Sequence, residues 1–203
     1  MNHKYSAKLK IDVKLFDNDL HPIEFLKSLI ILNSNEKVHY HYRLPKEHIS
    51  NELMRFFAKH RQYIDFIEIF YIPPHESIDI HIDGDMFGSF GKLNWVFGGA
   101  NSKMIWYTIL DPVCQGDTNK TDISSTALVY QPSQVEFSYS ENLQGPNLVE
   151  VGIPHTVRNS VEARWCVSVI FVNSHTKNYY HRPTLEESLE IFKDYIVGDP
   201  ERI

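Results

Sequence analysis

A short stretch in the first half of the chain combines one histidine with two acidic residues. In residues 77–84, Ser-Ile-Asp-Ile-His-Ile-Asp-Gly, strand alternation puts Asp79, His81 and Asp83 on one face and three isoleucines on the other. An imidazole and a carboxylate two positions apart on a strand leave the same face, so they can reach one metal ion together. A metal site would need a further ligand from elsewhere, and the carboxylate could come from Asp83 or from Asp79.

A second segment offers that further ligand. His155 follows Gly-Ile-Pro at a predicted strand end, 72 residues after Asp83, and Arg164 lies nine positions beyond it. On the strand that contains Arg164, the residues Arg164, Cys166 and Ser168 share one face. An arginine that points inward needs an anion, and a carboxylate suits its planar guanidinium best. That carboxylate could belong to an acidic side chain of the protein or to a ligand.

These four residues carry a family resemblance. Two histidines and one carboxylate on one side of an iron ion form a facial triad, which leaves coordination positions open. With His81, Asp83, His155 and Arg164, the chain resembles the Fe(II)/2-oxoglutarate-dependent oxygenase superfamily. The pattern of that superfamily is His-x-Asp, a distant histidine, and a basic residue about ten positions later.

The resemblance covers about residues 63–173. Residues 154–164 look similar to the aspartyl/asparaginyl β-hydroxylase-like branch, and Leu93-Asn94 with Trp106-Tyr107 looks similar to small phage and marine-bacterial members. The chain departs from the pattern just after the basic residue. Many members have Arg-x-Ser there, whereas this chain has Arg-Trp-Cys, so the second contact to the far carboxylate of the cosubstrate differs.

The resemblance implies a fold, a pair of cofactors and a set of site residues. It implies a mainly-β double-stranded β-helix, or jelly roll, in which His81, Asp83 and His155 bind Fe(II). Arg164 would then bind the far carboxylate of the cosubstrate 2-oxoglutarate, which such enzymes convert to succinate with O2 while they hydroxylate a substrate. No catalytic residue is predicted beyond the metal ligands. Further residues expected to line the cofactor pocket are Asn94, Trp106 and Ser168.

A second function from a different class fits the same histidines. The sequence Gly-x-Pro-His-x-x-x-Asn at residues 152–159 is also similar to the second motif of cupins. The alternative is therefore a cupin-like jelly-roll protein that binds a metal or another ligand without oxygenase activity. Its candidate ligands are His39, His81 and His155. The discriminating residue is Arg164, because only the oxygenase needs it to bind 2-oxoglutarate.

The patterns along the chain predict one domain over residues 1–203. Segments of strand character separated by turn residues give about eight strands between residues 63 and 173, which is typical of an antiparallel sandwich or barrel. An N-terminal layer of strands and helices is expected over residues 1–62, and a C-terminal helix over residues 184–197 after a capping box. In the N-terminal layer we expect strands over 8–16 and 38–43, and helices beginning at Pro22 and at Pro45.

The overall composition excludes several functional classes. The 203 residues carry a net charge of −6, which argues against a general binder of nucleic acid or of anionic membranes. Only two cysteines occur, Cys114 and Cys166, so no disulfide framework is expected. No apolar run reaches the roughly 18 residues of a membrane span. We therefore expect a cytoplasmic protein that acts on a small-molecule, amino-acid or peptide substrate together with O2.

Overall fold

Strands are the commonest secondary structure in the described part of the chain. The computed structural model describes residues 5–33, 40–84, 90–113, 116–120, 126–173 and 181–198. The strands are β1 (Ser6–Lys8), β2 (Tyr40–Leu44), β3 (Tyr63–Ile72), β4 (Ile80–Asp83), β5 (Gly91–Gly98), β6 (Lys103–Ile109), β7 (Asp117–Lys120), β8 (Thr126–Tyr130), β9 (Val135–Glu141), β10 (Gly145–Glu150), β11 (His155–Arg158) and β12 (Arg164–Val172). The α-helices are α1 (Pro22–Asn33), α2 (Asn51–Lys59) and α3 (Leu185–Ile191).

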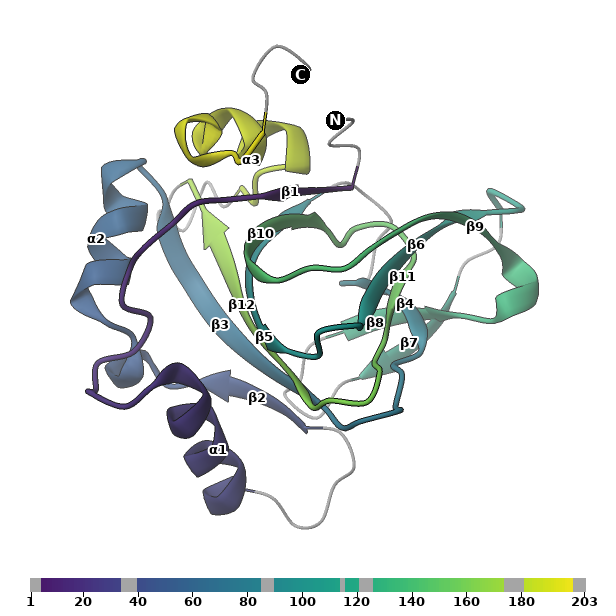
Figure 1. Cartoon of the computed structure of the whole chain (residues 1–203). Coiled ribbons are helices and arrows are strands. Elements are labelled where there is room, and N and C mark those ends of the chain that lie inside the picture. Colours follow the sequence, from purple (N-terminus) through teal and green to yellow (C-terminus); the bar gives the residue numbers. More distant parts are fainter. Residues whose placement is uncertain are drawn as a thin grey trace.

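Two antiparallel sheets of six strands form the body of the molecule (Figure 1). The first sheet has the order β1-β10-β5-β12-β3-β2, and the second has the order β7-β8-β4-β11-β6-β9. From β3 to β6, and again from β9 to β12, each successive strand belongs to the other sheet. This winding between two facing sheets is the double-stranded β-helix, and it confirms the predicted mainly-β jelly roll.

The first sheet separates an outer core from an inner one. On β12, whose nine residues are all buried, Trp165, Val167 and Val169 belong to the outer core. This core also takes in Leu53 and Phe57 of α2, and Phe192 next to α3. In Figure 1 the three helices lie along the outer side of this sheet. The opposite face of β12 is therefore free to line the space between the two sheets.

Strand β4 is an interior strand of the second sheet. It pairs with β8 along its whole length, from Ile80 opposite Tyr130 to Asp83 opposite Ala127. On its other side it meets β11 at a single register position, where His81 lies opposite His155. The short strand β7 continues the sheet beyond β8. Neither β7 nor β11 was expected as a strand from the sequence pattern.

The N- and C-terminal predictions need correction in their bounds. The predicted strand over 8–16 is wrong, because β1 ends at Lys8 and only isolated bridges at Leu9 and Phe16 follow. The predicted helix over 184–197 is shorter, because the chain bends to pair with this N-terminal segment. Leu9 forms a bridge with Ile196, and the backbone N–H of Lys10 donates to the carbonyl of Tyr195. The helix therefore ends at Ile191, and a single 3-10 turn follows at Lys193–Tyr195.

The remaining helix predictions hold with small changes. A helix begins at Pro22 as expected, whereas the region after Pro45 contains a 3-10 turn at Lys46–His48 before α2. None of the helices in the described ranges combines the length and the apolar character that crossing a membrane requires. His39 and Cys114, which the sequence singled out, lie outside the described residues.

The cap of α2 gives a stability prediction. The hydroxyl of Ser50 accepts a hydrogen bond from the backbone N–H of Leu53 at 3.0 Å and donates one to the carbonyl of Lys14. Ser50→Ala removes both bonds, so we expect the free energy of unfolding to fall by about 1 to 2 kcal/mol in urea titrations. The matched control is Ser133→Ala at an exposed position, expected to stay within about 0.5 kcal/mol. Equal stability of the two variants would contradict the capping role.

Candidate metal centre

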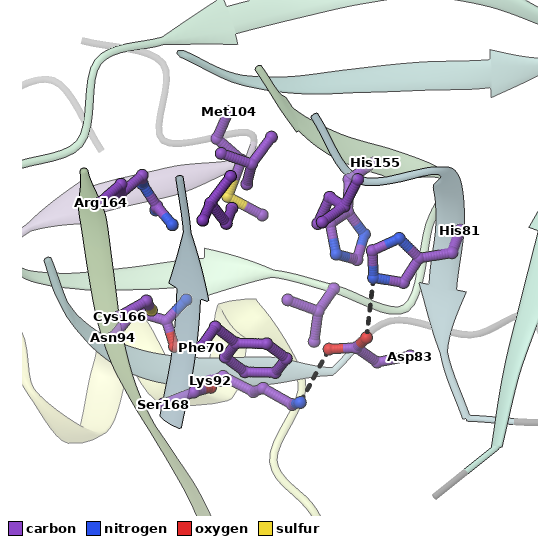
Figure 2. A pocket seen from close by; sticks show the side chains of 14 residues that line it. Phe70, His81, Asp83, Lys92, Asn94, Met104, His155, Arg164, Cys166 and Ser168 are labelled. Carbon is purple, nitrogen blue, oxygen red and sulfur yellow. Dashed lines mark ion pairs between the residues drawn. The ribbon is translucent and has the colours of Figure 1, made fainter. Parts of the chain in front are cut away.

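Strands β4 and β11 bring two histidines and one aspartate to a common point. His81 and His155 lie directly opposite each other in the sheet, and their ring centroids are 4.5 Å apart. Asp83, two positions after His81, leaves β4 on the same side, as strand alternation requires. One ligand atom from each of the three residues lies within 4.8 Å of the others. Figure 2 shows the two rings side by side with the Asp83 carboxylate next to them.

Both imidazole rings are oriented by a carbonyl of their own strand. The Nδ1 atom of His81 lies 2.8 Å from the carbonyl oxygen of Asp79, and Nδ1 of His155 lies 2.9 Å from that of Ile153. A carbonyl oxygen only accepts, so each Nδ1 carries a hydrogen, and a neutral ring then keeps its lone pair on Nε2. This second-shell arrangement is the usual one for histidines that ligate a metal. The Nε2 of His81 lies 3.3 Å from Oδ1 of Asp83.

The protonation states of the cluster suit a cation. Burial and the neighbouring His81 lower the pKa of His155 to about 4, so this ring is neutral at pH 7. Burial alone would raise the pKa of Asp83, but the Lys92 ammonium and the hydrogen bond with His81 hold it well below its usual value. The same carboxylate raises the pKa of His81 despite the burial of that ring. At neutral pH the cluster therefore offers a carboxylate and an unprotonated imidazole.

The sequence left open whether Asp83 or Asp79 supplies the carboxylate of the cluster, and the structure distinguishes the two. Asp83 belongs to the cluster, whereas Asp79 precedes the first residue of β4, and its side chain is exposed. The part of Asp79 that serves the cluster is its backbone carbonyl, on Nδ1 of His81. Strand alternation predicts the face of a residue only where the strand extends, and β4 begins one residue later.

This separation gives a test. Because Asp79→Ala keeps the backbone carbonyl, we expect the affinity for Mn²⁺ to stay within about twofold of the parent protein in calorimetric titrations. Asp83→Ala removes the candidate ligand and serves as the matched comparison. If both substitutions weaken binding equally, the assignment of Asp83 is wrong.

A cavity between the two sheets opens beside the cluster. The volume inside it that a water-sized sphere can occupy is about 50 Å³. In Figure 2, Arg164, Asn94, Cys166 and Ser168 lie across the cavity from the two histidines. The residues that line the cavity are Phe70, Ile72, Ile78, His81, Asp83, Lys92, Asn94, Met104, Val151, His155, Val157, Arg164, Cys166 and Ser168.

Arg164 is the charged group of the far wall. It is 3% exposed, and no acidic side chain in the described part of the chain forms an ion pair with it. Its contact with the thiol of Cys166 opposes the effect of burial, which lowers the pKa of Arg164. Gly99 packs closely against it, since an added Cβ there would lie 2.8 Å from Cβ of Arg164. The guanidinium is thus held in place without a counter-ion from the described side chains.

The other residues predicted to line the pocket divide into two groups. Asn94 and Ser168 line the cavity, and the buried Oδ1 atom of Asn94 has no hydrogen-bond partner among the residues that the structure describes. Trp106 lies outside the lining, although it is the sheet neighbour of His155. Its ring is fully buried and stacks on Tyr5 at 5.6 Å, and its Nε1 donates to the carbonyl of Glu150. Core packing and this hydrogen bond explain its position.

Lys92 is a site residue that sequence reasoning missed. Its ammonium lies 2.7 Å from Oδ2 of Asp83 and 2.8 Å from Oε2 of Glu68, and it is 5% exposed. The sequence did contain a signal for Lys92, because it shares a strand face with Asn94, which is predicted to line the pocket. The sequence pattern predicts a strand over residues 93–97, whereas β5 begins at Gly91, so the predicted strand excluded Lys92.

Comparisons with known proteins give distant likenesses. No family model and no curated protein matches the chain. Among solved structures, Escherichia coli ycfD is 17% identical with a TM-score of 0.35, over 70% of this chain and 33% of that one. Pumpkin seed globulin is 13% identical with a TM-score of 0.35, over 72% and 33% of the two chains. An oxidoreductase of the 2OG-Fe(II) oxygenase family from Burkholderia pseudomallei is 13% identical with a TM-score of 0.33, over 68% and 55%. The chain thus spans between a third and about half of the length of these proteins.

Proposed function

We propose that this chain is an Fe(II)- and 2-oxoglutarate-dependent oxygenase that hydroxylates a small-molecule, amino-acid or peptide substrate. The observation that carries the proposal is the buried guanidinium of Arg164, which lacks a carboxylate partner among the described residues and lines the same cavity as His81, Asp83 and His155. A buried charge without a partner is costly, so it indicates an anionic ligand.

The residues that line the cavity fit both Fe(II) and 2-oxoglutarate. Two imidazole Nε2 atoms and one carboxylate oxygen make the donor set that suits a non-haem iron ion and leaves positions open. A dicarboxylate could place one end near this donor set and the other on Arg164, since a guanidinium binds a carboxylate with two parallel hydrogen bonds. The unpartnered Oδ1 of Asn94 gives the same wall a further polar contact, for a donor group or a water molecule.

Each side chain has a defined task in this proposal. His81, Asp83 and His155 would hold Fe(II), which when bound would couple decarboxylation of 2-oxoglutarate by O2 to hydroxylation of a substrate. Arg164 would orient the cosubstrate, and Cys166 would pack beside it as a neutral thiol, because burial raises its pKa. The apolar lining excludes water from the reacting groups. That part of the lining includes Phe70, Ile72, Ile78, Met104, Val151 and Val157.

The test is the fate of 2-oxoglutarate. The purified protein with Fe(II), 2-oxoglutarate and O2 should release succinate slowly even without substrate, and Mn²⁺ with 2-oxoglutarate should raise the melting temperature above that with Mn²⁺ alone. If Mn²⁺ binds but 2-oxoglutarate neither binds nor is consumed, the oxygenase proposal fails. The cupin-like alternative, a metal- or ligand-binding jelly roll, then describes the protein.

A further inference from the structure

A buried chain of charges lies behind the metal centre. Lys92 contacts Asp83 at Oδ2 and Glu68 at Oε2, while the other oxygen of Glu68 lies 3.5 Å from Nε2 of His41. Glu68 and Lys92 are 3% and 5% exposed. Their strands β3 and β5 flank β12, and on this face Glu68 lies opposite Ser168, which in turn lies opposite Asn94. These charged side chains therefore belong to the same wall of the cavity as the residues predicted to bind the cosubstrate.

The two oxygens of Asp83 have different neighbours. Oδ1 lies 3.3 Å from Nε2 of His81, inside the ligand cluster, whereas Oδ2 is occupied by the Lys92 ammonium (Figure 2). A carboxylate can bind a metal ion through one oxygen or through both. Binding through both would take a coordination position that a chelating cosubstrate needs. The ion pair with Lys92 disfavours this second mode.

We propose that Lys92 reserves Oδ2 of Asp83, so that Asp83 presents only Oδ1 to the metal, and that Glu68 holds Lys92 in this position. The inference rests on the proposed metal and 2-oxoglutarate site, and it makes Lys92 a positioning residue. Glu68 is needed because a lysine with Asp83 as its sole partner could turn toward an anionic ligand in the cavity. The two carboxylates compensate the positive charge of Lys92. Of the described residues that line the cavity, Arg164 is then the cation left to bind the cosubstrate.

The test uses a substitution that removes the pair without changing the net charge. In Lys92→Met/Glu68→Gln, Asp83 loses the ammonium that neutralised it, and the bound metal ion takes over that role. Glu68 needs no counter-ion in this variant, because its carboxylate has become a neutral amide. The matched control is Lys193→Met/Glu190→Gln, which removes an exposed lysine–glutamate pair of 2.6 Å. Calorimetry measures the affinity for Mn²⁺ and then the affinity of the Mn²⁺-loaded protein for 2-oxoglutarate, in the absence of iron so that no turnover occurs.

The expected result is a split between the two affinities. In Lys92→Met/Glu68→Gln the dissociation constant for Mn²⁺ stays the same or falls, because Asp83 can then bind the ion through both oxygens. The dissociation constant for 2-oxoglutarate rises by about tenfold, because the second oxygen takes a coordination position that the cosubstrate needs. The control pair changes neither. If both affinities fall together, or neither changes, the pair is merely structural and the inference is overturned.

Two further outcomes are distinguishable. A parent protein that binds no Mn²⁺, or binds Mn²⁺ but no 2-oxoglutarate, overturns the proposed function and this inference with it. If the double variant does not fold, as circular dichroism would show, Lys92→Gln replaces it, because the amide keeps a donor for Glu68 while the ammonium is gone. The same split is expected of that variant, and its absence counts against the inference.

Discussion

Replacing His155 by alanine is expected to abolish metal binding and, with it, the release of succinate from 2-oxoglutarate. His155 is 3% exposed and its ring is oriented by the carbonyl of Ile153, so in the proposed centre its Nε2 would be a preorganised ligand. Loss of a second-shell partner alone typically costs 10- to 100-fold in metal affinity, so loss of a ligand should weaken Mn²⁺ binding by more than about 100-fold. Titration calorimetry and succinate assays measure the two effects.

A surface histidine provides the matched control. His181 is paired with Glu187 at 2.9 Å, and its side chain is 41% exposed. His181→Ala should therefore keep both metal binding and succinate release, and a folded His155→Ala variant should keep the circular dichroism of the parent. Succinate release that continues unchanged in His155→Ala would refute the proposed metal centre.

The second large effect is expected at Arg164. Because a buried charge pair that loses one partner typically costs at least 2 kcal/mol, Arg164→Ala should raise the dissociation constant for 2-oxoglutarate by about 100-fold. Metal affinity should change far less, since the guanidinium lies across the cavity from the ligand cluster (Figure 2). Calorimetric titration of the Mn²⁺-loaded variant with 2-oxoglutarate measures the loss.

Arg164→Lys distinguishes charge from geometry. Lysine keeps the positive charge but loses the planar fork that binds a carboxylate with two parallel bonds, so it should recover only part of the affinity. If Arg164→Ala binds 2-oxoglutarate as tightly as the parent protein, the guanidinium serves another purpose, and the cupin-like alternative gains support.

Local alternation was enough to predict several strands of an antiparallel sandwich or barrel and the inner face of one of them, whereas the jelly roll was predicted from the family resemblance. The sequence pattern predicts strands over residues 63–72 and 164–172, and these are the bounds of β3 and β12. Both strands are long and rich in β-branched and aromatic residues, which makes their pattern clear. Alternation also predicts that Arg164, Cys166 and Ser168 share a face, and all three line the cavity. Short strands escaped this reasoning, since the four residues of β7 and of β11 carry too little pattern.

The sequence predicted which residues share a strand face better than it predicted which of them line the cavity. Met104 and Trp106 belong to the same inner core of β6, yet Met104 lines the cavity and Trp106 does not. The difference depends on tertiary contacts with Tyr5 and Glu150, which are far away in the sequence. The pairing of Lys92 with Glu68 and Asp83 likewise joins three strands, and a single sequence contains no signal for such a partnership.

The interior position of β4 has a consequence for how a metal ion would enter and leave the proposed centre. All four of its residues pair with β8, so the strand that carries His81 and Asp83 is held by backbone hydrogen bonds of the protein itself. Small metal domains such as zinc fingers unfold when their ion is removed. Here a chelator should strip the ion reversibly from a folded protein, and the amide hydrogens of Ile80–Asp83 should remain protected from exchange with solvent throughout.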